Sequence, residues 1–182
     1  KVEKTAEGTT ETIKTIEKDF ANSKEMEALR NNINVSIIDI GEALLYLEDE
    51  LDNTAKDLEV SADEKARITE KQKYLTNAYT TLSNYHNQLI TMLETSEEDM
   101  SGTILKLNNS LSALNSAIIN MNSNINTSIS DNTIVPSEIT TMLSFIANAS
   151  LKNNEYKNTI SDAILLGVGG KLTESMLQII KT

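Results

Sequence analysis

The one histidine, His86, is the side chain of this sequence best suited to chemistry near neutral pH, because an imidazole titrates in that range. A single histidine in a chain without cysteine excludes a His-based metal cluster, a two-histidine HExxH site and Cys-ligated zinc or iron–sulfur sites. The missing cysteine also excludes disulfides and thiol catalysis. His86 lies on an apolar stripe between Leu82 and Leu89. It is therefore either a hydrogen-bonded core histidine or part of a polar pocket.

Tyr79 and Asn153 are polar residues at stripe positions and are the candidate companions of His86. Counting helical turns from the predicted connections places Asn153 near the level of Leu82, with Tyr79 and His86 about one turn to either side. The three side chains would then line one cavity and bind a small molecule. The alternative is that they, together with Gln72, set the helix register, because a buried polar group is left unpaired in every other alignment.

Arg30 is a further candidate ligand-binding residue, because it falls on the stripe between Met26 and Ile33. A guanidinium there would hold a carboxylate through two hydrogen bonds. The alternative is that its head group reaches the edge of the bundle or pairs with a neighbouring acid. The acidic run at 48–52 lacks the alternating spacing of a calcium loop and is typical of a solvated helix face, so we predict no metal site.

The sequence contains none of the common enzyme signatures. It has no G-x-S-x-G elbow, no Walker-type glycine loop and no G-x-G-x-x-G motif. Asp and Glu are plentiful, but a hydrolase built on two carboxylates needs a cleft, whereas regular apolar stripes predict a filled core. We therefore predict a non-enzymatic protein that needs no cofactor.

The composition indicates that helices must position these residues. Six Gly, one Pro, two Phe and no Trp among 182 residues are too few for the turns of a β-sandwich, a barrel or a Rossmann-type sheet. We predict one all-α domain over residues 1–182. The net charge of -11 arises within residues 1–100, where 22 acids stand against 11 bases. This excess of negative charge disfavours nucleic acid and anionic lipid as partners.

Four segments carry apolar residues at alternating spacings of three and four, which is typical of coiled-coil-like helices. They cover roughly residues 10–58, 62–94, 100–129 and from 136 onward. Ser61 and Glu64 predict a capping box at the start of the second segment. The third segment is rich in Asn and Ser, which we assign to its outer face.

Short connections between long helices require antiparallel neighbours. We therefore predict an antiparallel up-down-up-down four-helix bundle with long, coiled-coil-like first and last helices. Residues 1–25 and 165–182 would project together as a stalk. Gly167, Gly169 and Gly170 interrupt the last stripe and are predicted hinge positions, unless they simply end the helix.

This outline is similar to the extracytoplasmic four-helix sensor domains of bacterial chemoreceptors and related two-transmembrane receptors. The similarity lies in helix lengths and helix ends over the whole chain, and it implies first and last helices that continue into a membrane. The chain has no initial Met, no signal-peptide pattern and no 18-residue apolar run. We interpret it as a mature protein or as an excised part of a larger one.

These observations predict a non-enzymatic, extracytoplasmic (periplasmic or cell-surface) sensor or interaction module of a larger, membrane-anchored bacterial protein. It would bind a protein partner, a second copy of itself or a small molecule, and it would act by rearrangement of its helices. Two alternatives remain open. One is a soluble helical assembly protein, such as a pore-forming toxin component or a secretion or phage structural subunit, and the other is a plain coiled-coil spacer.

Overall fold

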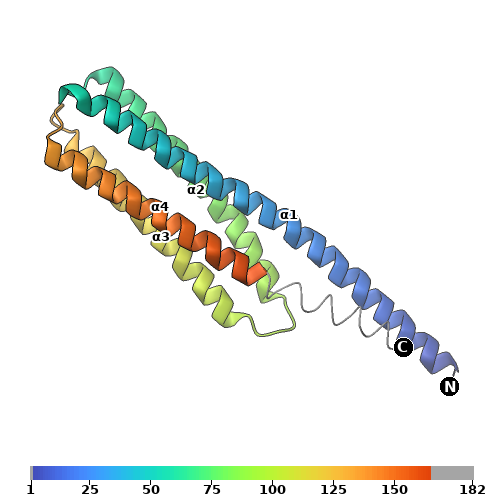
Figure 1. Ribbon diagram of the computed structural model, residues 1–182. Coiled ribbons are helices and arrows are strands. Elements are labelled where there is room, and N and C mark those ends of the chain that lie inside the picture. The colour runs from blue at the N-terminus through green and yellow to red at the C-terminus, as the bar shows by residue number, and fades with distance from the viewer. Residues whose placement is uncertain (1, 165–182) are drawn as a thin grey trace.

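The computed structural model describes residues 2–164, with side chains over residues 24–163. α1 spans Val2–Thr54, α2 Ala62–Glu94, α3 Ser101–Ser128 and α4 Pro136–Ile164, and a short 3-10 turn, η1, spans Ala55–Asp57. This part of the chain is an antiparallel four-helix bundle, which confirms the predicted all-α class (Figure 1).

None of the described helices is both long enough and apolar enough to cross a membrane.

The four helices form two closely paired hairpins. α1 contacts α2 extensively and α3 contacts α4 extensively, whereas α1 and α4 meet over a smaller area. The contact between α2 and α3 is the least extensive of these four pairings. α1 is the longest helix, and its N-terminal part extends well beyond the other three (Figure 1).

The closed end of the bundle, where α1 turns into α2 and α3 into α4, is held by backbone hydrogen bonds between the two connections. The Val60 N–H donates to the Asn132 carbonyl at 2.8 Å, and the Ile134 N–H donates to the Leu58 carbonyl at 3.1 Å. Val60 and Ile134 are also buried. The two hairpins are therefore fixed to each other at this end.

The start of α2 has the predicted capping box. Ser61 Oγ accepts from the Glu64 N–H at 3.1 Å, and Glu64 Oε1 accepts from the Ser61 N–H at 3.0 Å. The predicted place of Leu58 at the end of the first stripe is wrong, because α1 already ends at Thr54. Leu58 follows η1 in the left-handed region with φ of 59° and is 47% exposed.

The core consists of the predicted stripes. The buried stripe residues of α1 are Ile33, Ile37, Ile40, Leu44, Leu47 and Leu51. The stripes of α2 and α3 are likewise buried, except for the partly buried Tyr79 and Ile104, and they include the predicted polar positions Gln72 and His86. Because apolar side chains fill most of the interior, the few buried polar groups are the places where specific chemistry can reside.

Candidate functional site

His86 is the centre of a hydrogen-bond network that joins three helices and runs from the core to the exposed residue Asn108. It is 2% exposed, and its ring lies 2.7 Å (Nδ1) from Tyr156 Oη on α4 and 2.8 Å (Nε2) from Asn108 Oδ1 on α3. An amide oxygen can only accept, so the imidazole donates from Nε2 to Asn108. In the neutral ring, Nδ1 then accepts from the Tyr156 hydroxyl.

Burial keeps this network uncharged. Removal from water lowers the pKa of His86 below its ordinary value of 6.5, although the hydrogen bond to Asn108 opposes the shift. Burial raises the pKa of Tyr156 far above its ordinary value, and the neighbouring Tyr79 adds to this effect. At neutral pH the network therefore holds neither a cation nor a phenolate.

Asn153 extends this set of polar contacts to α1. It lies about one turn before Tyr156 on α4 and is 4% exposed. Its Nδ2 donates to the Ile37 carbonyl of α1 at 3.0 Å, while its Oδ1 is buried and has no hydrogen-bond partner among the described residues. We call His86, Tyr156, Asn108 and Asn153 the polar layer. Hydrogen bonds of the polar layer link α4 to α1 and to α2, and they link α2 to α3.

The structure places Tyr79 near this layer but does not make it a member. Tyr79 is partly buried, and burial raises its pKa, although the nearby Ser83 on the same helix opposes the shift. Tyr156 is a position of the predicted apolar stripe of the last segment that was not selected as a site residue, and it is completely buried. The signal that could have identified it is its hydroxyl, because a tyrosine on a buried stripe needs a hydrogen-bond partner. The arrangement agrees with the register-setting interpretation of these residues.

Arg30 does not occupy the predicted stripe position. Arg30 is exposed, and the buried row of α1 passes through Met26, Leu29 and Ile33 instead. The predicted place of Arg30 on the buried stripe is therefore wrong. Leu29 fits the same helical spacing, and burying its apolar side chain does not remove a charge from water. The role of Arg30 in ligand binding stays a prediction. The predicted hinge residues Gly167, Gly169 and Gly170 lie outside the described residues.

No group of three or more Asp, Glu or His side chains among the described residues is arranged to hold a metal ion.

Two hydrogen bonds between polar side chains link α2 to α3. Gln72 Nε2 donates to Asn126 Oδ1 at 3.1 Å. The second is the hydrogen bond from His86 Nε2 to Asn108 Oδ1. Asn122 also has a buried Oδ1 without a partner among the described residues. Part of the Asn-rich side of α3, which we assigned to its outer face, therefore faces α2. This polar pairing is also the least extensive contact among the four adjacent helix pairs of the bundle.

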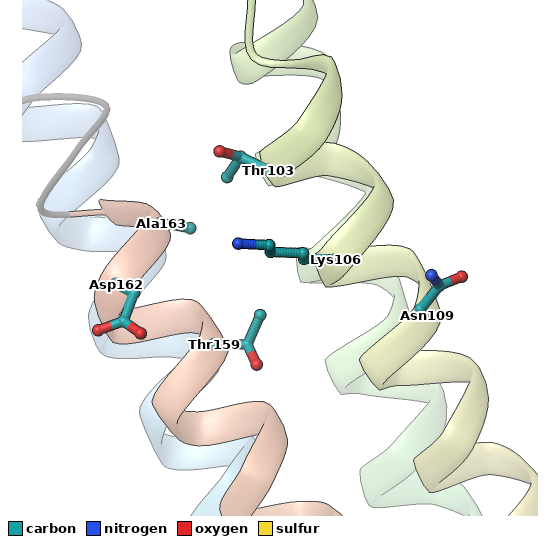
Figure 2. Close-up of a pocket in the computed structure, with 6 residues that line it drawn as sticks. All are labelled: Thr103, Lys106, Asn109, Thr159, Asp162 and Ala163. Atoms are coloured by element: carbon teal, nitrogen blue, oxygen red, sulfur yellow. The ribbon is translucent and has the colours of Figure 1, made fainter.

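A groove of about 340 Å³ lies between α3 and α4, away from the closed end (Figure 2). It is lined by Thr103, Lys106, Asn109, Thr159, Asp162 and Ala163. Lys106 is the only charged residue of α3 and reaches across the gap toward α4, whereas the Asp162 carboxylate is directed away from it (Figure 2). The groove is large enough for a small molecule and offers it one ammonium group and several hydroxyl or amide groups.

No family model, curated protein or solved structure matches this chain. The function must therefore be argued from the geometry alone.

Proposed function

We propose that this chain is a non-enzymatic extracytoplasmic sensor or interaction module of a larger, membrane-anchored bacterial protein. One observation supports the proposal most directly: α1 projects beyond the bundle from the end toward which α4 also runs (Figure 1). Met26 is the first buried residue among the described side chains of α1. The helix before it, residues 2–25, is about 36 Å long at 1.5 Å per residue.

A helix that leaves the bundle in this way can transmit a displacement made inside it. If a partner or ligand favours another position of α4, the change appears as a movement of α4 against α1 at the projecting end. The closed end is pinned by the bonds between its two connections, so it provides the fixed point for such a movement.

The polar layer would make this movement stepwise. Sliding α4 along α1 separates Tyr156 from His86 and Asn153 from the Ile37 carbonyl, and each buried group left unpaired costs about 1–3 kcal/mol. Intermediate positions of α4 are therefore unfavourable, and we expect α4 to move between two discrete packings and not through a continuous range of positions. His86, the only histidine of the chain, is neutral and has a hydrogen bond at each ring nitrogen, which supports a role in helix packing.

The predicted location can be tested because the chain has no cysteine. Ser112 is exposed on α3, so a Ser112→Cys variant adds one reactive thiol to this part of the protein, and its labelling is scored against the same gene product without the substitution. We expect a membrane-impermeant maleimide to label this variant in intact cells that express the complete gene product. The same reagent should label a cytoplasmic control protein only after lysis. Labelling of Ser112→Cys only after lysis would overturn the extracytoplasmic proposal and favour a soluble assembly protein.

A further inference from the structure

α1 carries a second row of residues at coiled-coil spacing on the face directed away from the core, and three of its seven positions are aliphatic. Its positions alternate by four and three, and all of them are exposed: Asn31, Val35, Ile38, Glu42, Leu45, Asp49 and Asp52. We call this row the outer seam. Val35 is 56% exposed, Ile38 59% and Leu45 60%. The spacing is that of a coiled-coil interface, on the side that no other described helix covers.

The three aliphatic residues of the outer seam are close together, unlike the other exposed aliphatic residues of the helices. They lie within residues 35–45, a length of about 15 Å along one helix. α3 exposes Leu105 and Ile119, which are four turns apart, and α4 exposes Leu151. Single exposed apolar side chains need no explanation, but a row at heptad spacing presents a surface that a partner helix can cover.

The charges along α1 identify the kind of helix that fits. Between residues 31 and 54 the chain has six acids and no base. Glu50 of α1 forms a salt bridge with Arg67 of α2, with 2.7 Å between Oε1 and Nε. The three acids of the outer seam, Glu42, Asp49 and Asp52, form no salt bridge with any described residue. A covering helix that brings Lys or Arg to these positions would neutralise them.

A second copy of this chain fits the outer seam poorly. Pairing two outer seams would bring two sets of acids together with no base from either copy between residues 31 and 54, which is unfavourable by like-charge repulsion. Phosphate-bearing surfaces are disfavoured by the same negative charge. A basic amphipathic helix is the occupant that satisfies both the apolar row and the acids.

We propose that the outer seam of α1 binds a basic amphipathic helix of a partner protein. Apolar side chains of that helix pack against the three aliphatic positions, and its Lys or Arg side chains lie beside the three acids. This inference rests on the proposed function as an interaction module and deepens it by naming the surface and the chemistry of the partner.

The probe is a fluorescent synthetic peptide with Leu at the core positions and Lys at the flanking positions of successive heptads. Its binding to the purified chain is measured by fluorescence anisotropy. The outer-seam variant is V35S/I38S/L45S, and the matched control is L105S/I119S/L151S, which removes three equally exposed aliphatic side chains elsewhere. A charge variant, E42Q/D49N/D52N, is paired with the control E59Q/E97Q/E98Q, which neutralises exposed acids outside α1.

We expect saturable binding that both outer-seam variants weaken by about tenfold or more, which corresponds to about 1.4 kcal/mol. Both controls should stay within about twofold, a change well below that free energy. A peptide with Glu in place of Lys should not bind. Unfolding curves of all variants should superimpose, since only exposed side chains are changed.

The inference is overturned if the wild type shows no saturable binding or if the controls lose as much affinity as the outer-seam variants. It is also overturned if sedimentation shows a dimer that V35S/I38S/L45S dissociates, because a second copy would then occupy the seam. Neither result bears on the maleimide labelling of Ser112→Cys, so this inference and the proposed location fail separately.

Discussion

Replacing Tyr156 by Phe tests whether the polar layer contributes to the stability of the bundle. The substitution keeps the aromatic ring, which is completely buried, and removes only the hydroxyl that donates to His86 Nδ1 at 2.7 Å. No water can replace that donor unless the core rearranges, because His86 is itself only 2% exposed. The variant therefore leaves one buried ring nitrogen without a partner.

The expected magnitude follows from that unpaired nitrogen. A buried polar group that loses its partner costs about 1–3 kcal/mol, while the hydrophobic contribution of the ring is unchanged. For a domain of this size, a loss of 1 kcal/mol lowers the melting temperature by roughly 2–4 °C. We therefore expect Tyr156→Phe to melt roughly 2–12 °C below the wild type.

The assay is urea and thermal unfolding at a pH above 7, followed by circular dichroism at 222 nm. Tyr74→Phe is the matched control, because Tyr74 is 40% exposed and packs its ring against Tyr46 without donating a buried hydrogen bond. It should unfold like the wild type. If Tyr156→Phe is as stable as Tyr74→Phe, the hydroxyl makes no net contribution and the argument from the unpaired nitrogen is refuted.

Three further outcomes are expected. Burial lowers the pKa of His86 from 6.5, so the unfolded chain takes up a proton that the folded chain does not. The contribution of His86 to the free energy of unfolding is therefore complete above pH 6.5 and decreases as the pH falls below that value. The urea midpoints of the wild type and of His86→Gln are compared from about pH 7 down to about pH 5, and only the wild type should show this decrease. Ser61→Ala removes a capping bond and should lower the free energy of unfolding by about 1 kcal/mol, whereas Thr80→Ala, which alters an exposed hydroxyl within α2, should have a smaller effect. Leu58→Asn should be about 1 kcal/mol more stable than Leu58→Ala, because both give up the half-buried Leu side chain while only Asn tolerates the left-handed backbone, and an Asn variant no more stable than the Ala variant would contradict the strain argument.

The helices were predictable from the sequence because their apolar residues recur every three or four positions, and that period survives almost unchanged in the buried rows. The capping box was predictable for a similar reason, since Ser61 and Glu64 interact within one turn. The errors arose where two readings fit the period. Leu29 and Arg30 both continue the row from Met26, and only packing against neighbouring helices decides that Leu29 is buried.

The polar layer was predictable only in part. Turn counting placed His86 and Asn153 at neighbouring levels because the connections are short, and both are buried in the structure. Asn108 could not be selected, because it is one of many asparagines on α3 and its contact depends on how the helix is rotated against α2. The burial of Tyr156 followed from its place on the apolar stripe of the last segment, whereas its hydrogen bond to His86 depends on how α4 packs against α2, which no single segment reveals.

The most direct test of the central claim is to read the coding sequence on both sides of the codons for Lys1 and Thr182. The proposed membrane-anchored module predicts an apolar run of about 20 residues on each side, the length that spans the hydrocarbon core of a bilayer. A complete reading frame without such runs would contradict the claim and make a soluble helical assembly protein the better account of this bundle.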